Sequence, residues 1–361
     1  MPAPWGAVTV LGPKGKVLAM VSAPSYNDNW WEPFMSTAHY NELENAPGDP
    51  LLNYAVNSEE PPGSTFKLAT ATAALNDGLI NADTTVDDTG SYTIGTLTLH
   101  DSESSGLGVV NVVSAVAESS DVFFYNVGDW FDQDTKKFGA TPIQTVANAY
   151  GIGAQTGIDL PSNEVATGWV DSLATREALY HEDPRVYGPP TWYPADNVEM
   201  AFGQGKTVTD TLDMANAYAT FADGGARYAP ELASAIESPS GKVIKQIAPK
   251  VLGKVSLPAS TRSLLSAGFT GAVRSAGGTA NAAFSGFDFT SWSIAGKTGT
   301  ATVSTNSNIP TTAWFVAYGG PSTDPSEYTV AVEISEAGYG ADAAAPVARS
   351  IFAYLQKHPI G

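Results

Sequence analysis

Ser64 and Lys67 lie three positions apart at the start of an apolar stretch whose pattern predicts a helix over residues 64–76. Lys67 is the only charged residue in that stretch, and a helix without a polar face belongs in a protein core. A lone lysine in a core is costly unless it has partners or loses its proton. Ser64 lies one turn earlier at the helix N-terminus, so the pair could be a nucleophile and its base. Alternatively, Ser64 caps the helix and Lys67 extends to solvent.

A second polar group, Glu118-Ser119-Ser120-Asp121, separates two apolar helical stretches. Serine and aspartate before a helix are ordinary N-terminal caps, which is one interpretation of this motif. The functional interpretation makes Ser119 a proton relay and Asp121 a polar contact to a substrate amide.

A third group lies in a predicted strand that contains two glycines and a single lysine, Lys297. Glycine weakens a strand interior, so it indicates close approach by another backbone, and a peptide substrate could pair there as an added strand. Lys297, Thr298 and Thr300 would offer a cation and two hydroxyls to a carboxylate. The backbone N–H groups of Thr300 and Ser64 could form an oxyanion hole. A bulged strand with an exposed lysine is the alternative.

Strands are predicted near both ends of the chain. Two β-rich runs around a Gly-Pro turn predict an opening hairpin. Residues 24–62 are predicted to form an ordered loop because their aromatic side chains require burial, namely Trp30, Trp31, Phe34 and Tyr40. The predicted strands are at 7–11, 16–22, 289–303, 312–318 and 327–335. The predicted helices are at 64–76, 110–118, 121–131, 142–150, 209–223, 258–274 and 341–357.

This order of elements predicts an α/β (α+β) fold over residues 1–361. One antiparallel sheet lobe is assembled from both ends of the chain, about 1–60 and 226–361, and a mainly helical lobe, about 61–225, is inserted between them.

Composition excludes several classes of protein. The chain has 361 residues and a net charge of −19, from 18 Lys plus Arg against 37 Asp plus Glu, and this charge would repel nucleic acid. It has no cysteine, which excludes disulfides and thiolate metal sites, and its four histidines are dispersed. No apolar run reaches the roughly 20 residues that a membrane span needs, so we expect a soluble fragment.

In chain order, S-x-x-K at 64, S-x-D at 119 and K-T-G at 297 resemble the motif set of the penicillin-binding proteins and class A β-lactamases. The resemblance extends over nearly the whole chain, including the hairpin at 15–26 and a Gly-Gln-Gly segment at 196–219. It is greatest to the transpeptidase domain of class B enzymes of the cell-elongation type. It implies a penicillin-binding or serine β-lactamase-like fold whose antiparallel sheet has five strands.

The resemblance also implies roles for individual residues. Ser64 would be the nucleophile, a neutral Lys67 its base, and Ser119 and Lys297 would relay a proton to the leaving amine. Implied catalytic residues are Ser64, Lys67, Ser119, Asp121 and Lys297, and implied substrate-binding residues are Thr298, Gly299 and Thr300. No metal or organic cofactor is required. One departure is Asp121, where most relatives carry asparagine, because an aspartate accepts hydrogen bonds but cannot donate one unless protonated.

By the same resemblance, the substrate is a peptidoglycan stem peptide ending in D-Ala-D-Ala, and β-lactam antibiotics acylate the same serine. Cell-elongation complex proteins are expected partners, and nucleic acid is not. The expected location is extracytoplasmic, with a membrane anchor in the full-length protein that is absent from this chain.

Three other functions compete with this prediction. A serine β-lactamase or β-lactam sensor shares the three motifs, but the E-x-x-x-N deacylation loop is incomplete here, since Glu164 lacks the partner asparagine. A nucleotide-binding loop at Gly203–Thr207 lacks its first glycine, because Met200 stands there. A non-catalytic peptidoglycan-binding scaffold of the same fold would be expected to have lost at least one motif.

Overall fold

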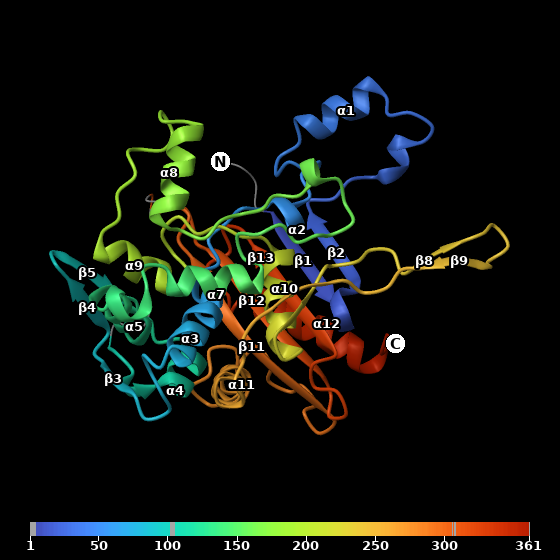
Figure 1. Ribbon diagram of the computed structural model, residues 1–361. Helices are drawn as coiled ribbons and strands as arrows, with labels where there is room; N and C mark the ends of the chain where they lie inside the picture. Colours follow the sequence, from blue (N-terminus) through green and yellow to red (C-terminus); the bar gives the residue numbers. More distant parts are fainter. Residues whose placement is uncertain (1–4, 102–104, 305, 307, 361) are drawn as a thin grey trace.

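A computed structural model describes residues 5–101, 105–304, 306 and 308–360. Its centre is a five-stranded antiparallel sheet in the order β11-β12-β13-β1-β2. The strands are β1 (Gly6–Leu11), β2 (Val17–Ala23), β11 (Trp292–Ala301), β12 (Thr312–Pro321) and β13 (Tyr328–Ile334). The first and last parts of the chain therefore share one sheet, drawn in blue and orange-red in Figure 1. This confirms the predicted fold class and the five-stranded antiparallel sheet.

Helices cover both faces of this sheet. Trp314 and Val316 of β12 point into the core that contains α10 (Thr211–Ala222), and Phe315 and Ala317 point into a second core that contains α12 (Ala344–Lys357). Side chains alternate across a strand, so a strand buried on both faces must be apolar throughout. This accounts for the almost uninterrupted burial of β12.

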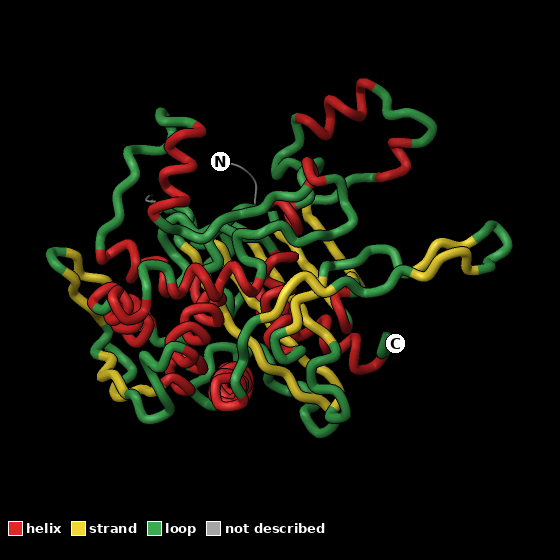
Figure 2. The backbone as a smooth tube through the Cα atoms, in the orientation of Figure 1, coloured by secondary structure: helices red, strands yellow, loops and turns green. Residues whose placement is uncertain are grey.

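A mainly helical region connects the two ends of the sheet (Figure 2). Its helices are α3 (Lys67–Asn76), α4 (Val112–Ala117), α5 (Asp121–Gln133), α6 (Thr135–Phe138), α7 (Pro142–Tyr150), α8 (Leu173–Glu182) and α9 (Pro194–Ala201). Helix α3 lies at the centre of this region, and its residues from Lys67 to Ala74 are all buried. A later helix, α11 (Ala259–Arg274), packs against both α4 and β11.

Short strand pairs and single helical turns surround these elements. The paired strands are β3 (Thr85–Asp88) with β6 (Gly108–Asn111), β4 (Ser91–Ile94) with β5 (Leu97–His100), β7 (Ala226–Tyr228) with β10 (Val251–Lys254), and β8 (Ala235–Glu237) with β9 (Val243–Gln246). The short helices and turns are η1 (Pro13–Gly15), η2 (Asp28–Trp31), α1 (Thr37–Glu44), α2 (Tyr54–Asn57), η3 (Gly63–Phe66) and η4 (Ser162–Glu164). None of the described helices is both long and apolar enough to cross a membrane.

Two local predictions were wrong. The helix expected over 110–118 begins only at Val112, because the side chain of Asn111 accepts hydrogen bonds from the N–H groups of the first turn and residues before it pair with β3. Three of the aromatic side chains expected to be buried between 24 and 62 are exposed, namely Trp31, Phe34 and Tyr40, and Phe34 is 88% exposed. The part of that segment around α1 projects away from the sheet, so these aromatic residues have little to pack against (Figure 1).

Candidate active site

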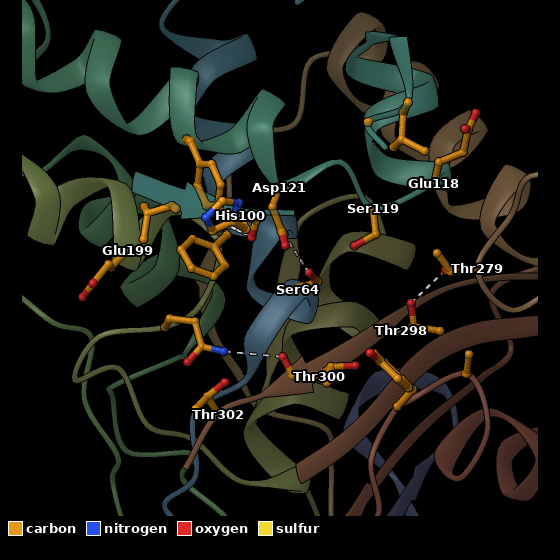
Figure 3. A pocket seen from close by; sticks show the side chains of 18 of the residues that line it. Ser64, His100, Glu118, Ser119, Asp121, Glu199, Thr279, Thr298, Thr300 and Thr302 are labelled. Atoms are coloured by element: carbon orange, nitrogen blue, oxygen red, sulfur yellow. Dashed lines mark hydrogen bonds between the residues drawn. The ribbon is translucent and has the colours of Figure 1, made fainter. Parts of the chain in front are cut away.

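A cavity of about 1040 Å³ lies where β11, the start of α3 and the start of α5 meet. Figure 3 shows Ser64, Ser119, Asp121, Thr298 and Thr300 around it. Lys67 and Lys297 are fully buried beside these residues. The structure therefore brings together the residues of all three sequence motifs.

Ser64 lies in η3, a tight turn that continues directly into α3. Gly63 begins this turn with φ +52°, and a Cβ atom there would lie only 2.7 Å from the carbonyl oxygen of Thr300. A glycine is needed for so close an approach in the left-handed region. The first motif is thus packed directly against the third. The Oγ atom of Ser64 makes a long hydrogen bond of 3.5 Å to Oδ1 of Asp121.

Lys67 has hydrogen-bond partners although none of its surface is exposed. Its Nζ atom lies 2.5 Å from Oδ1 of Asp121, 2.8 Å from the carbonyl oxygen of Ser119 and 3.3 Å from that of Ser120. It also lies 3.3 Å from Oγ of Ser119. The alternative of a lysine that extends to solvent is therefore wrong. Between the described residues no hydrogen bond joins Lys67 to Ser64, and Asp121 is instead the partner that both share.

Asp121 begins α5, and its backbone N–H donates to Oδ2 of Asp101 at 2.8 Å. Burial raises the pKa of the Asp121 carboxyl above its ordinary value, while the positive charge of Lys67 lowers it and the negative charge of Asp101 raises it. The net direction is upward. Asp121 is therefore an acid held between an alcohol and an amine, in a setting that makes its negative charge costly.

The two serines in the turn between α4 and α5, Ser119 and Ser120, have different roles. Ser120 is the cap of α5, since its Oγ accepts the N–H of Phe123 at 3.0 Å and donates to Asp88 at 2.6 Å. Ser119 has φ +66°, in a region that residues other than glycine adopt only at a cost of about 1–3 kcal/mol. The cap interpretation thus applies to Ser120, and the strained Ser119 faces the cavity and Lys67.

Lys297 is buried in β11, so the alternative of an exposed lysine is also wrong. Its Nζ donates to the carbonyl oxygen of Thr298 at 3.1 Å. Burial holds the pKa of Lys297 well below its ordinary value, and the charge of Lys67 lowers it further, whereas Asp121 and Asp101 raise it. The site thus contains two buried lysines and two nearby carboxylates.

Gly299 allows β11 to pass close to the turn that carries the nucleophile candidate. A Cβ atom at Gly299 would lie 2.8 Å from the carbonyl oxygen of Pro62 and 2.9 Å from Cβ of Trp314. The close approach that the glycine permits is therefore to this chain's own backbone, whereas the sequence had suggested a substrate strand. Strand β11 is nonetheless an edge strand of the sheet, as the addition of a peptide strand requires.

Several residues of the site were missed by sequence reasoning. Thr279 lines the cavity, and its Oγ1 accepts a hydrogen bond of 2.7 Å from the hydroxyl of Thr298. Asp101 holds the start of α5, and Glu199 and His100 line the cavity wall. These residues come from loops or short elements with no diagnostic spacing, so only the tertiary structure identifies them.

Two other sequence candidates lie elsewhere or act differently. Glu164 is an exposed residue of η4, and it is not among the described residues that line the cavity. Gly203, in the segment considered as a nucleotide-binding loop, accepts a hydrogen bond of 3.0 Å from the N–H of Gly63. That segment therefore supports the turn that carries Ser64.

Comparisons with known proteins agree with this geometry. The family model described as penicillin binding protein transpeptidase domain matches residues 6–353. Peptidoglycan D,D-transpeptidase MrdA of Haemophilus influenzae is 30% identical over 97% of this chain and 52% of that protein. Peptidoglycan D,D-transpeptidase PbpA of Mycolicibacterium smegmatis is 29% identical over 96% of this chain and 66% of that protein. The chain thus spans about half the length of the MrdA relative and two thirds of PbpA.

Solved structures are similar over the same extent. PBP2 of Pseudomonas aeruginosa in complex with WCK 5153 is 29% identical with a TM-score of 0.79, and the match covers 97% of this chain and 71% of that one. A chain from a peptidoglycan synthase complex is 30% identical with a TM-score of 0.79, over 99% of this chain and 56% of that one. Penicillin-binding protein A of M. tuberculosis, as a ceftriaxone acyl-enzyme complex, is 26% identical with a TM-score of 0.78, and the match covers 97% of this chain and 74% of that one.

Proposed function

The chain belongs to the penicillin-binding protein transpeptidase domain family, and from this premise we propose that it is a serine D,D-transpeptidase that cross-links peptidoglycan stem peptides through an acyl-enzyme at Ser64. The observation that carries the proposal is the cavity itself. A serine with a buried lysine and a partly exposed carboxylate beside it faces a row of threonine hydroxyls on an edge strand. This arrangement suits attack on a peptide carbonyl whose chain ends in a carboxylate.

Acylation begins when Oγ of Ser64 attacks the carbonyl carbon of the penultimate D-Ala of a stem peptide. The serine proton passes to Lys67, which acts as the base in its neutral form, after the lysine has given a proton to its ion-pair partner Asp121. Asp121 orients both groups, because its Oδ1 atom accepts from each of them. The N–H groups of Ser64 and Thr300 stabilise the oxyanion, a role supported by the direct packing of the first motif on the third.

The tetrahedral intermediate collapses when the bond from its carbon to the amide nitrogen breaks and the terminal D-Ala leaves as an amine. Ser119 and Lys297 relay a proton to that amine, a role supported by the contact of Ser119 with Lys67 and by the burial of Lys297 beside them. Thr298 and Thr300, on the Lys297 strand with Gly299 between them, bind the terminal carboxylate before it leaves.

The acyl group is then transferred to an amine of a neighbouring stem peptide, which forms the cross-link and frees Ser64. β-Lactams acylate the same serine, as the acyl-enzyme complex of the M. tuberculosis relative indicates for that protein. We place the chain outside the cytoplasm, in a membrane-anchored full-length protein that works with the cell-elongation complex. The similarity to a chain from a peptidoglycan synthase complex supports such partners.

The test supplies a stem pentapeptide as donor and a second stem peptide as amine acceptor. Transpeptidation predicts release of D-Ala together with a cross-linked dimer, and neither product with Ser64→Ala. Release of D-Ala without dimer, at every acceptor concentration, would instead support a hydrolase. Failure of both donor turnover and penicillin acylation would support a non-catalytic scaffold.

A further inference from the structure

The hydroxyl of Thr298 is already occupied in the free cavity. It donates its single hydrogen to Oγ1 of Thr279 at a distance of 2.7 Å (Figure 3). Thr279 is not part of the three motifs, but it lines the same cavity. A carboxylate can accept from Thr298 only if this hydroxyl turns away from Thr279, because a hydroxyl has one hydrogen to donate.

Thr279 is held in a fixed position by backbone hydrogen bonds. Its N–H donates to the carbonyl oxygen of Ala117 at 3.3 Å, which ties it to the end of α4, just before the second motif. The N–H of the next residue, Ala280, donates to Ala272 of α11 at 2.8 Å. Thr279 is therefore anchored between the second motif and the helix that packs on β11, and its hydroxyl stays within reach of Thr298.

The pair of hydroxyls can exchange donor and acceptor without a movement of heavy atoms. When Thr298 turns its hydrogen to a carboxylate, Thr279 can turn its own hydrogen to Oγ1 of Thr298 across the same contact. No polar atom then loses its partner, and a hydroxyl that accepts a hydrogen bond is a stronger donor to an anion. A side chain of similar shape without a hydroxyl would provide neither the acceptor nor the donor.

We propose that Thr279 is a positioning residue for carboxylate recognition, which acts through Thr298 and sets the direction of its hydroxyl. This inference rests on the proposed function, in which Thr298 binds the carboxylate of the substrate or of a β-lactam. Thr279 itself takes no part in the chemical step. Its removal changes how well the carboxylate is bound and leaves the attack by Ser64 unchanged once the ligand is bound.

The experiment compares Thr279→Val, which keeps the shape, with Thr279→Ser, which keeps the hydroxyl. Thr302→Val serves as a matched control, because Thr302 lines the same cavity. Rapid-mixing acylation by a penicillin separates the concentration for half-maximal acylation from the limiting rate, and the methyl ester of the same penicillin removes the carboxylate. Melting temperatures establish that each variant is folded, and Thr279→Ala replaces the valine variant if that one is not.

For Thr279→Val we expect the half-maximal concentration of the free acid to rise about five- to tenfold, the size of effect that one lost hydrogen bond gives. The limiting rate, the methyl ester, Thr279→Ser and Thr302→Val should all stay within about twofold of their references. Thr279→Val should add nothing to Thr298→Val, because it acts through that residue.

Equal losses for acid and ester, or additive losses in the double variant, would overturn the inference, as would an unaffected Thr279→Val. If the unmodified protein is not acylated at all, the proposed function fails. If the unmodified protein is acylated normally and the Thr279 variants behave like it, the proposed function stands and this inference alone fails.

Discussion

The side chains of Asp121 and Lys67 form an ion pair in which Oδ1 lies 2.5 Å from Nζ, with the lysine fully buried and the aspartate partly exposed to the cavity. The same oxygen accepts from Ser64, so the carboxylate stands between the nucleophile and the base assigned to it. This relationship explains how a lysine can be buried in an apolar helix without an unsatisfied charge. It also gives Asp121 a role in the chain that does not depend on donating a hydrogen bond to the substrate.

Replacement of Lys67 by alanine should nearly abolish acylation and leave the fold intact. General base catalysis contributes about 10²- to 10⁴-fold, and that factor is lost with the amine. Asp121 would lose its cationic partner, but its pKa is already raised, so it can take a proton in place of that partner. The rate of penicillin acylation and the circular dichroism spectrum measure the two effects. Acylation within a few-fold of wild type would exclude Lys67 as the base.

The variants Asp121→Asn and Asp121→Ala should differ in their rates of acylation by penicillin. The asparagine keeps an acceptor oxygen for both Ser64 and Lys67, so acylation should stay within about tenfold of wild type at neutral pH. Alanine removes the shared acceptor, and the rate should fall by more than about 10²-fold, which corresponds to about 2.7 kcal/mol of barrier. A loss of that size already in Asp121→Asn would mean that the negative charge itself is required.

The pH dependence of acylation should report on Lys297. If its positive charge is needed, the rate falls as pH rises through its pKa, which burial holds well below the ordinary value. The charge of Asp121 raises the pKa of Lys297, so Asp121→Asn should lower that pKa further. The alkaline limb of the profile should then move to lower pH in the variant. An unchanged limb, or one displaced to higher pH, would contradict a required Lys297 cation.

Stability should decrease as pH rises, because of a group of buried carboxyls between β13 and α10. Burial raises the pKa of Asp210 to about 7, and it raises those of Asp213 and Glu333 well above their ordinary values. In the folded state these groups keep protons that the unfolded chain has already lost. Their contribution to the free energy of unfolding is therefore present below about pH 4 and is lost as pH rises through the folded pKa values.

Urea unfolding at several pH values measures this effect. Each group contributes a slope of up to about 1.4 kcal/mol per pH unit between its unfolded and folded pKa. Asp213→Asn and Glu333→Gln should each make the decline shallower, whereas Glu237→Gln at an exposed position should not. A free energy of unfolding that increases between pH 5 and pH 8, with the same slope in all variants, would show that these carboxyls do not dominate its pH dependence.

The penicilloyl adduct should persist for minutes to hours, and Glu164→Gln should not alter its lifetime. Glu164 is exposed and lies outside the set of described residues that line the cavity, so it is not placed to activate water there. Mass spectrometry of the adduct over time provides the measurement. Steady-state hydrolysis of penicillin at about 1 s⁻¹ or faster, within the ordinary range of enzyme turnover, would instead indicate a β-lactamase.

The residues of the site that could be predicted from sequence are those whose type is unusual among their sequence neighbours. Lys67 stands out because its helix has no other charge, and the structure buries it completely. Lys297 stood out less, because a strand with glycines is compatible with an exposed lysine. Its burial depends on neighbouring elements that lie far away in the sequence.

The site residues that the sequence did not predict were missed for a common physical reason. Asp101 and Thr279 reach the site through hydrogen bonds to residues 20 and 19 positions away, and neither belongs to a periodic pattern. The prediction for Phe34 was wrong for the opposite reason. Its aromatic side chain was expected to be buried, but the chain projects from the sheet there and the side chain is exposed. Local sequence indicates which side chains are unusual, whereas the tertiary fold decides which ones meet.

Covalent labelling with a penicillin tests whether Ser64 is the nucleophile. The protein is incubated with benzylpenicillin, its intact mass is measured, and the labelled peptide is identified after proteolysis. We predict one added penicillin per chain, on the peptide that contains Ser64, and no label on Ser64→Ala. Absence of an adduct, an adduct on another peptide, or undiminished labelling of Ser64→Ala would contradict the assignment of Ser64 and with it the proposed transpeptidase.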